Sequence, residues 1–529
     1  MPAAAPDLHV YDTTLRDGAQ QEGLNLSVAD KLAIAGAIDE LGIGYIEGGW
    51  PGANPKDTEF FARAQTQLRL RNATLAAFGA TRRADGSAAT DPLVRALLDS
   101  AAPVVTLVAK SHVRHVEQAL RTTLAENLAM IRDTVTFLRA QGRRVFLDAE
   151  HFFDGYAADR AYAIECVRAA AESGAEVIAL CDTNGGMLPA QVADVVRDVL
   201  DASGARVGIH CHNDTGCAVA NSMAAVAAGA THVQGTVNGY GERTGNANIL
   251  TLIGNLQIKQ GLPLVAPERL REATRIAHAI SEVTNVPPYS RQPYVGASAF
   301  AHKAGLHASA LRVDPDLYQH TDPATVGNSM RTLVSDMAGR ASIELKAAEL
   351  GVDLSTDPAV VAGLLAEVKD LELAGWTFDA ADASFELLLR KHLGQAVSYF
   401  EVESWRVITE TRATAGATSE ATVKLCAGGV RRVATGEGNG PVNALDHALR
   451  QALAEAYPEL DTLELVDFKV RILEASHGTD AVTRVLIETS DATTTWQTVG
   501  VAANIVEASW RALVDGIEYG LIRRGVPVR

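Results

Sequence analysis

The sequence predicts a (β/α)8 (TIM) barrel, followed by helical subdomains and a C-terminal α+β domain with a βββα pseudo-repeat. Two observations predict the barrel: eight short apolar, β-branched runs recur through roughly the first 250 residues, and helical patterns separate them. A third is that polar side chains suited to catalysis follow the ends of these runs, where barrel enzymes carry their active sites. At 529 residues the chain is too long for one ordinary core, which indicates two or three domains.

The expected strands share short length and apolar, β-branched composition. They are Leu8–Tyr11, Tyr45–Glu47, Thr74–Phe78, Val104–Val108, Val145–Leu147, Val177–Leu180, Val207–His210 and His232–Val237. A doubly wound open sheet has the same alternation, but it usually carries a glycine-rich phosphate-binding segment after its first strand. Here Asp12–Gly18 carries a carboxylate and an arginine instead, which favours the barrel.

The helices between these strands have recognisable starts and stops. Ser27 to Asp30 forms a capping box, an apolar stripe runs from Leu32 to Leu41, and Gly42 ends the helix. The same pattern predicts helices over Glu126–Gln141 and Gln191–Ala202.

Three segments follow from the change of pattern along the chain. We expect a catalytic barrel over residues 1–265, helical connecting subdomains over 266–395, and an effector-binding and dimerisation domain over 396–529. The connecting segment is broken by prolines, and alternating strands begin at Ser398. Two matching helix starts, Gly440–Leu445 and Ala503–Ala508, mark the halves of the repeat and indicate a pseudo-symmetric regulatory module.

The strands expected in this last segment are Tyr399–Thr409, Ala421–Ala427, Leu463–Ile472, Thr483–Glu488 and Thr495–Val501, with Val430–Thr435 as the weakest prediction. Two helices, Val442–Ala456 and Ile505–Ile522, complete the order ββ(β)α–βββα.

Composition narrows the class of protein. A net charge of −17 disfavours nucleic acid or an anionic membrane as the main partner. The five cysteines form no Cys-x-x-Cys pair, which predicts reduced thiols and a cytoplasmic location. The sequence has neither a signal peptide pattern nor an apolar run long enough to span a bilayer.

Four side chains are candidate metal ligands. His210 and His212 lie at positions i and i+2 of a strand end, so both imidazoles project to the same side. Asp17 adds a carboxylate from the first strand and Asn246 is a possible fourth ligand. Mixed nitrogen and oxygen ligands with open positions suit Mg²⁺, Mn²⁺, Co²⁺ or Zn²⁺ bound together with a chelating substrate. For the histidines alone, a hydrogen-bonded strand end is the alternative.

Other polar residues at the strand ends are candidates for substrate binding and catalysis. Arg16 can stabilise a developing oxyanion, or form a salt bridge with Glu47, or do both. Thr183 can donate to a substrate carboxylate, with a helix N-cap as the alternative. Glu150 is a candidate general base, with the orientation of a metal ligand as its alternative role.

These motifs resemble those of the acyl-CoA-dependent keto-acid synthases, the family of 2-isopropylmalate, homocitrate and citramalate synthases. The resemblance rests on Asp12–Gly18, His210–Asp214, Asn238–Asn246, Gly305–His307, Tyr318 and Gly436–Ala444. Two further segments, Glu47–Asp57 and Asp148–Tyr156, look most like one type of citramalate synthase. Isopropylmalate enzymes more typically carry a Glu-Val-Gly-Phe-Pro-type segment at the first of these, where this chain has Gly48 and Trp50.

The resemblance implies a metal-dependent Claisen-type condensation of acetyl-CoA with pyruvate, giving citramalate and CoA for isoleucine biosynthesis. The metal would be Mg²⁺ or Mn²⁺, with Zn²⁺ or Co²⁺ as alternatives, and Arg16, Glu47 and Thr183 would bind the substrate. It further implies a homodimer in which His307 and Tyr318 assist catalysis from the partner subunit. The C-terminal segment would bind a branched-chain amino acid, isoleucine if the product is citramalate.

Several alternatives make different predictions. A 2-isopropylmalate or homocitrate synthase would take a larger 2-keto acid, which the bulk of Trp50 disfavours. A hydroxymethylglutaryl-type lyase would carry a reactive cysteine in the glycine-rich loop, but Gly239–Gly245 has none. A biotin-linked carboxyltransferase would carry a lysine at a strand end near the metal, and none is there. A non-catalytic metabolite sensor would bind an effector without releasing CoA.

Overall fold

The computed structural model describes residues 8–354, 357–412, 416–473 and 481–529. The chain divides into two compact units, and each is described by itself. The first unit comprises the residues up to Phe300 together with Thr321–Ser329, and the second comprises Ala301–His320 and Met330–Arg529.

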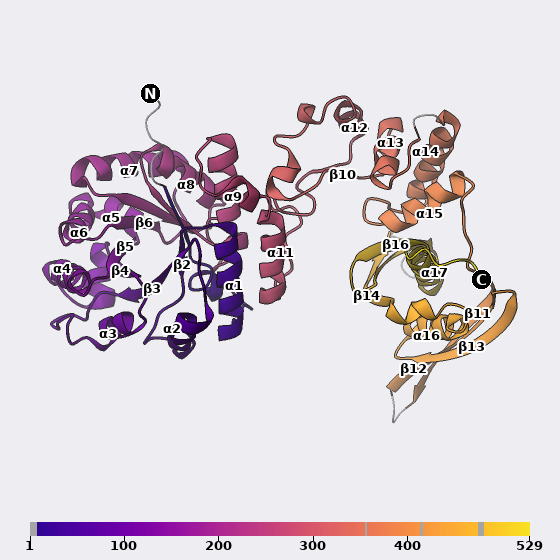
Figure 1. Ribbon diagram of the computed structural model, residues 1–529, viewed down its shortest axis with the longest axis horizontal. Coiled ribbons are helices and arrows are strands. Elements are labelled where there is room, and N and C mark those ends of the chain that lie inside the picture. The colour runs from indigo at the N-terminus through magenta and orange to yellow at the C-terminus, as the bar shows by residue number, and fades with distance from the viewer. Residues whose placement is uncertain (1–7, 355–356, 413–415, 474–480) are drawn as a thin grey trace. The chain divides into compact units, whose positions relative to one another are not determined.

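The first unit contains a closed barrel of parallel strands in chain order, which confirms the predicted fold class (Figure 1). The last strand pairs in parallel with the first, His9 opposite His232 and Asp12 opposite Gly235, so the sheet has no free edge. The strands are β1 (His9–Asp12), β2 (Tyr45–Glu47), β3 (Thr74–Ala80), β4 (Val104–Lys110), β5 (Arg144–Glu150), β6 (Val177–Asp182), β7 (Val207–Cys211) and β8 (His232–Gly235).

Helices surround the barrel in Figure 1. They are α1 (Val28–Leu41), α2 (Pro55–Gln67), α3 (Pro92–Asp99), α4 (Leu124–Ala140), α5 (Phe152–Ala158), α6 (Arg160–Glu172), α7 (Pro189–Ser203), α8 (Ala218–Ala227), α9 (Ile249–Ile253), α10 (Pro267–Leu270) and α11 (Ala273–Thr284). Short 3₁₀ and π-helical turns are η1 (Gly18–Gln20), η2 (His115–Leu120), η3 (Val237–Gly239), η4 (Gly254–Lys259) and η6 (Pro323–Val326).

Helix α1 shows why the sequence folds as predicted. The Ser27 hydroxyl accepts a hydrogen bond from the Asp30 amide at 3.2 Å, and the Asp30 carboxylate accepts one from the Ser27 amide at 2.8 Å. Both orphan amides of the first turn are thereby satisfied. Gly42 ends the helix with φ of 92°, a left-handed conformation that glycine adopts without steric cost.

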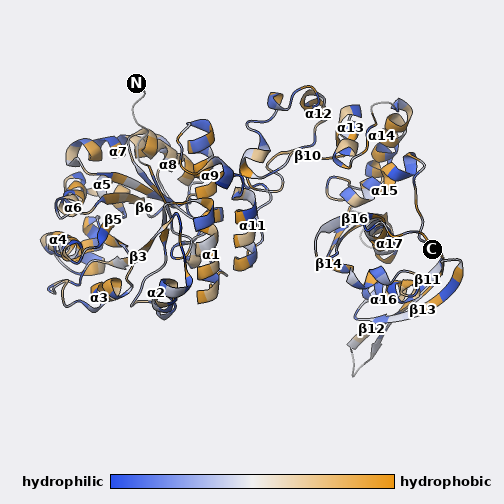
Figure 2. Cartoon of the chain, in the orientation of Figure 1, coloured by the Kyte–Doolittle hydropathy of each residue, from blue (hydrophilic) through white to orange (hydrophobic). Residues whose placement is uncertain are grey.

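The core of this unit has two layers. Aromatic side chains fill the barrel interior, where Tyr11, Tyr45 and Phe146 pack together with Val177. A larger layer lies between strands and helices and includes Ile34, Ile38 and Leu41 of α1. Figure 2 shows apolar residues along the barrel strands, while the surrounding helices carry both apolar and polar residues.

Within the described residues, the second unit contains six α-helices, a two-stranded parallel sheet and two antiparallel sheets of three strands each. Its first elements are β9 (Ala301–His302), α12 (Gly305–Leu311), η5 (Pro315–Leu317), β10 (Arg331–Thr332), α13 (Arg340–Glu349), α14 (Pro358–Leu373) and α15 (Asp382–His392). The first sheet and its helix are β11 (Phe400–Arg412), β12 (Gly416–Ala427), β13 (Val430–Gly438) and α16 (Pro441–Leu453). After η7 (Pro458–Thr462), the second set is β14 (Glu464–Ile472), β15 (Thr483–Ser490), β16 (Thr495–Ala502) and α17 (Ile505–Arg523).

The two sheets confirm the βββα repeat. Each has three strands in chain order, and the third strand of the first half, which the sequence indicated only weakly, runs over Val430–Gly438. The division at residues 265 and 395 stays a prediction. The chain leaves the first unit after Phe300, and α11 packs against α1 within that unit. All five cysteines lie in the described ranges and are free. Among the residues described, no helix combines the length and apolar character needed to cross a bilayer.

Candidate active site

A cavity of about 280 Å³ lies where the carboxyl ends of the barrel strands meet. Side chains that follow different strands share its wall, as the sequence predicted for a barrel mouth. Among them are Arg16, Asp17, Trp50, Phe78, Val108, Asp148, Glu150, Thr183, His210 and His212.

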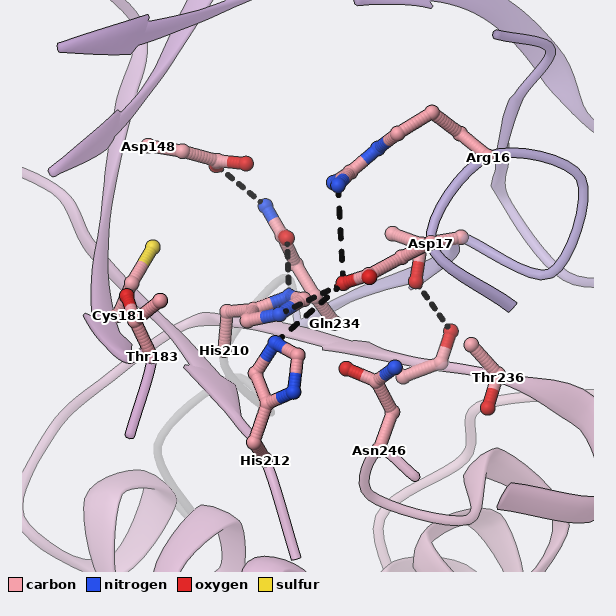
Figure 3. Close-up of polar contacts among 12 residues, drawn as sticks. Arg16, Asp17, Asp148, Cys181, Thr183, His210, His212, Gln234, Thr236 and Asn246 are labelled. Atoms are coloured by element: carbon pink, nitrogen blue, oxygen red, sulfur yellow. Dashed lines mark hydrogen bonds and ion pairs between the residues drawn. The ribbon is translucent and has the colours of Figure 1, made fainter. Parts of the chain in front are cut away.

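Asp17, His210 and His212 come together at this mouth (Figure 3). The Asp17 carboxylate lies 3.1 Å from Nε2 of His210 and 3.6 Å from Nε2 of His212. One ligand atom from each residue lies within 4.8 Å of the others, and all three side chains are buried. Three donors this close around one point can hold a metal ion.

The charges around Asp17 favour its ionised form. Burial alone would raise the pKa of Asp17, but the positive charge of Arg16 and the hydrogen bond with His210 bring this pKa well below its usual range. Burial, and then the charge of His210, lower the pKa of His212 to about 4. Asp17 therefore presents a carboxylate and His212 a neutral imidazole, the protonation states that metal ligands need. Burial alone would lower the pKa of His210, but its hydrogen bond with Asp17 raises it.

A buried chain of hydrogen bonds from Asp148 through Gln234 to His210, called the relay below, fixes the tautomer of His210 (Figure 3). The Gln234 side-chain nitrogen donates to Asp148 at 2.8 Å, so the Gln234 oxygen faces Nδ1 of His210 at 2.9 Å. Nδ1 must then carry a proton, which leaves Nε2, the nitrogen 3.1 Å from the Asp17 carboxylate, as the one that would bind a metal. Neither Gln234 nor its link to Asp148 was predicted from the sequence, although the alternation His232-Val233-Gln234 on a buried strand was the available signal.

The residues present fit a divalent cation. Asn246 donates through Nδ2 to the Tyr240 carbonyl at 3.1 Å, and its buried Oδ1 has no hydrogen-bond partner among the described residues. The buried carboxylates of Asp17, Glu47 and Asp148 are accompanied by the guanidinium of Arg16, whose side chain is 14% exposed. A divalent ion would use the free oxygen and offset the remaining negative charge.

Arg16 forms the salt bridge that the sequence analysis offered as one alternative. Its Nε contacts the Glu47 carboxylate at 2.5 Å, and its guanidinium lies 3.9 Å from the centre of the Phe78 ring. Glu47 is fully buried, also accepts from the Tyr11 hydroxyl at 2.8 Å, and does not line the cavity. The structure therefore brings Arg16 to the cavity and leaves Glu47 behind it, in contact with Arg16 rather than with the open space.

Glu150 and Thr183 both line the cavity. The Glu150 carboxylate contacts the ammonium group of Lys110. The Thr183 oxygen accepts from the His151 amide at 2.9 Å, so the Thr183 hydroxyl proton remains available to a ligand. The alternative that Thr183 is a helix N-cap is wrong, because α7 begins at Pro189 with Leu188 as its N-cap.

The glycines of the loop after β8 allow close contacts between parts of the loop itself. A Cβ on Gly245 would lie 2.0 Å from the Gly239 carbonyl oxygen, and one on Gly241 would lie 2.3 Å from Nδ2 of Asn246. All three glycines have positive φ. The close backbone approach that these glycines permit therefore occurs within the loop and presents Asn246.

His307 and Tyr318 lie in the second unit, apart from the residues of the barrel unit described so far. Their rings stack with centroids 4.2 Å apart. His307 is half-buried, whereas Tyr318 is 40% exposed. Their role in catalysis stays a prediction.

Comparison with known families agrees with this architecture. A profile of the HMGL-like family matches residues 7–278. One described as "Homocitrate synthase post-HMGL domain-like" matches residues 294–373. The LeuA allosteric (dimerisation) domain matches residues 379–521.

Curated relatives align along nearly the whole chain. An (R)-citramalate synthase of Streptomyces coelicolor is 65% identical over 98% of this chain and 97% of the relative. Another, of Aquifex aeolicus, is 48% identical over 98% of each chain. A probable 2-isopropylmalate synthase of Methanopyrus kandleri is 32% identical over 98% of this chain and 99% of the relative. The chain therefore belongs to the (R)-citramalate synthase family.

Proposed function

We propose that the barrel mouth condenses acetyl-CoA with pyruvate to give citramalate and CoA, as an acyltransferase that converts the acyl group to an alkyl group. The observation that carries this proposal is the buried cluster of Asp17, His210 and His212 beside Arg16. The cluster suits chelation of a 2-keto acid, and the relatives that align over nearly the full length are named for this product.

Asp17, His210, His212 and Asn246 would hold the metal, with Mg²⁺ or Mn²⁺ as the first choice and Zn²⁺ or Co²⁺ as alternatives. When bound, this ion supplies Lewis acidity that makes the keto carbon of the substrate electrophilic. Arg16 stabilises the negative charge that develops on the keto oxygen, because Glu47 and Phe78 fix its guanidinium at the cavity.

Thr183 and Glu150 complete the reaction. The free hydroxyl proton of Thr183 donates to the substrate carboxylate. Glu150 takes a proton from the acetyl methyl group, or positions the base that does so. The resulting carbanion bonds to the keto carbon, the π electrons of the keto group move onto its oxygen, and that oxygen takes up a proton to become the hydroxyl of the product. Water then attacks the thioester carbonyl, the carbon–sulfur bond breaks, and the sulfur leaves as the thiol of CoA. Lys110 holds the Glu150 carboxylate at the rim.

Trp50 supports pyruvate as the keto acid. Its indole lines the cavity and packs edge-on against Phe78 with ring centroids 5.4 Å apart. The alternative role for Trp50 is packing against a neighbouring helix, and an indole that lines the cavity favours contact with the substrate instead. The indole occupies space that a larger keto-acid side chain would need, and one methylene in an apolar pocket typically changes selectivity by roughly 10–200-fold.

The deciding measurement is CoA release with pyruvate, 2-ketobutyrate, 2-ketoisovalerate and 2-ketoglutarate side by side. We expect pyruvate to have the highest specificity constant, and Trp50→Ala to raise the relative use of 2-ketoisovalerate about tenfold or more. If 2-ketoisovalerate were the best substrate of the unchanged protein, it would be an isopropylmalate synthase and the pyruvate proposal would fail.

We further propose that the C-terminal domain binds isoleucine as a feedback effector of the homodimer, in keeping with a role in isoleucine biosynthesis. A cavity of about 630 Å³ lies at the start of α16. Its wall combines the helix N-terminus at Gly440 and Pro441, the carboxylates of Asp446 and Glu464, and apolar groups that include Val442, Leu465 and Phe468. A helix N-terminus suits a carboxylate, and acidic and apolar groups suit the ammonium group and aliphatic side chain of such an amino acid.

Val442→Trp should fill this cavity and remove inhibition by isoleucine without changing uninhibited turnover. Leu373→Trp, at an 89% exposed position of α14, is the matched control and should leave inhibition unchanged. Full inhibition of the Val442→Trp variant would move the effector site elsewhere.

A further inference from the structure

A buried ion pair holds the turn that carries Trp50. Lys31 of α1 and Asp57 of α2 are each 4% exposed, and their charged groups are in direct contact. Neither residue lines the keto-acid cavity. A buried charge is costly unless it is paired and hydrogen-bonded, so the contacts that complete this pair indicate what it supports.

Both charged groups bind the backbone of the same turn. The Lys31 ammonium donates to the Gly48 carbonyl at 3.1 Å. The second Asp57 oxygen accepts from the Trp50 amide at 2.8 Å. The pair therefore forms hydrogen bonds with the backbone on both sides of Gly49.

Gly48 and Gly49 allow the backbone to come close enough for these hydrogen bonds. Gly49 has φ of 137°, and a Cβ there would lie 2.4 Å from the Asp57 carboxyl carbon. A Cβ on Gly48 would lie 2.5 Å from the Phe60 ring. Only a chain without side chains at both positions can lie this close to α2.

The Trp50 indole depends on its backbone for its position. Its buried Nε1 has no hydrogen-bond partner in the described ranges of the chain, and its ring is in contact with Phe78. A second cavity of about 280 Å³ also touches Trp50, together with Arg16, Gln20 and the Lys31–Asp57 pair. An indole released from the turn would have this space to move into, and the keto-acid cavity would widen.

We propose that Lys31 and Asp57 are positioning residues that set keto-acid selectivity by holding the Trp50 indole at the wall of the cavity. The inference rests on the role of Trp50 in the proposed function. It adds two residues that touch neither substrate nor metal and act through the backbone of one turn.

The test measures specificity constants for pyruvate, 2-ketobutyrate and 2-ketoisovalerate in the full-length protein. Asp57→Ala and Lys31→Met should each lower the preference for pyruvate over 2-ketobutyrate about tenfold. The effect should come chiefly through KM, because the catalytic groups stay in place. Lys31→Arg keeps a charge for Asp57 and should restore most of the preference. If Asp57→Ala does not fold, as judged by circular dichroism, the isosteric Asp57→Asn takes its place and should relax selectivity in the same direction.

Asp39→Asn is the matched control. Asp39 also lies on α1, is 6% exposed, and accepts hydrogen bonds from the backbone amides of Arg71, Asn72 and Ala73, in the loop before β3. Its substitution should lower stability and leave selectivity unchanged. Equal relaxation in this variant would show a general effect of weakened packing and would overturn the inference.

Trp50→Ala separates this inference from the proposed function. If Trp50→Ala leaves selectivity unchanged, the role of Trp50 itself is wrong. If Trp50→Ala relaxes selectivity and Asp57→Ala does not, the positioning role alone fails. Asp57→Ala added to Trp50→Ala should have no further effect on selectivity, and an additional change would overturn the claim that Asp57 acts through Trp50.

Discussion

At the scale of single residues, the barrel mouth concentrates buried carboxylates. Asp12, Asp17, Glu47 and Asp148 are each no more than 3% exposed. Burial raises the pKa of Asp12 to about 7, and burial together with the charge of Glu47 raises the pKa of Asp148 to about 6. Asp17 differs because Arg16 and the two histidines oppose the effect of burial. Asp17, the carboxylate placed for a metal, is thus held in its ionised form.

Asp17→Ala should abolish turnover even when metal is in excess. The substitution removes the oxygen that faces both imidazole nitrogens, and with it Lewis-acid catalysis worth several kcal/mol, so kcat should fall about a thousandfold or more. CoA release at saturating Mg²⁺ or Mn²⁺ measures this. Asp154→Ala, at a side chain near the mouth that is 46% exposed, is the control and should turn over normally. Near-normal turnover of Asp17→Ala would refute the assignment.

Gln234→Leu tests the relay behind His210. Without the Gln234 oxygen, Nδ1 of His210 loses its acceptor and the tautomer that offers Nε2 is no longer fixed. We expect metal affinity to fall about 10–100-fold by calorimetric titration, the usual effect of losing such a partner. Gln257→Leu also removes a glutamine that bonds on both sides, to the Val265 amide and carbonyl, and should leave metal affinity intact. Equal affinities in the two variants would argue against the relay.

At the scale of secondary-structure elements, α17 carries two carboxylates into the packing of the second unit. Asp515 accepts from the Ser384 hydroxyl of α15 at 3.3 Å, and Glu518 lies one turn further along. On the same face Tyr519 donates to Glu386 of α15 at 2.9 Å. Burial is the main reason that the pKa of Asp515 and that of Glu518 are each raised to about 7.

The second unit should therefore lose stability as the pH rises from about 4 to about 7. An unfolded carboxyl group releases its proton near pH 4, whereas these two keep theirs in the folded state to about pH 7. The folded state binds more protons than the unfolded state between these two pH values. The contribution of the two protonated carboxyl groups to the free energy of unfolding is therefore complete below about pH 4 and lost above about pH 7. Asp515→Asn should reduce the slope of the unfolding free energy against pH. It should also raise the melting temperature at pH 8 by about 2–4 °C, as expected for a stabilisation of roughly 1 kcal/mol.

Tryptophan fluorescence can follow this transition because four of the five tryptophans belong to the second unit: Trp376, Trp405, Trp496 and Trp510. Asp461→Asn, at an exposed carboxylate of the same unit, should leave the slope unchanged. A slope that Asp515→Asn does not alter would mean that this carboxyl group does not titrate with folding.

At the scale of the whole molecule, the candidate catalytic residues are split between the two units. His307 and Tyr318 stack on each other in the second unit, next to apolar side chains that the unit leaves exposed. Leu306 is 74% exposed and Leu317 is 59% exposed. Such a surface is suited to contact with another protein surface, which agrees with the prediction that these residues serve a partner subunit.

Mixing two inactive variants tests that prediction. If His307 comes from the partner subunit, each active site of a homodimer combines Asp17 of one chain with His307 of the other. Asp17→Ala and His307→Ala then inactivate a site through different chains. A hybrid dimer then has one intact site of two, and equal mixing should restore about a quarter of the unchanged activity. Asp17→Ala mixed with His210→Ala is the control and should restore none, since both residues belong to the same barrel. Failure of the first pair, with exchange of subunits shown by mass spectrometry, would place His307 in its own subunit's site or outside catalysis.

Local patterns in the sequence predicted much of the fold. The capping box at Ser27 and the stop at Gly42 define α1 because both act within one turn of helix. The weakest predicted strand, Val430–Thr435, which extends to Gly438 in the structure, could not be settled locally, because its partner β12 supplies the pairing that holds it. In the site, the alternation of His210 and His212 on one strand predicted two imidazoles on the same side.

By itself, the sequence determined the barrel, the βββα repeat and the grouping of candidate ligands at one rim, since each follows from periodicity and from the parallel direction of the strands. Only the tertiary structure decided that Glu47 lies behind Arg16, that Gln234 links Asp148 to His210, and that Lys31 meets Asp57. These partners are 24 to 86 residues apart. No local preference encodes such pairings, because a buried charge or amide takes its partner from whichever element the packing brings within hydrogen-bond distance.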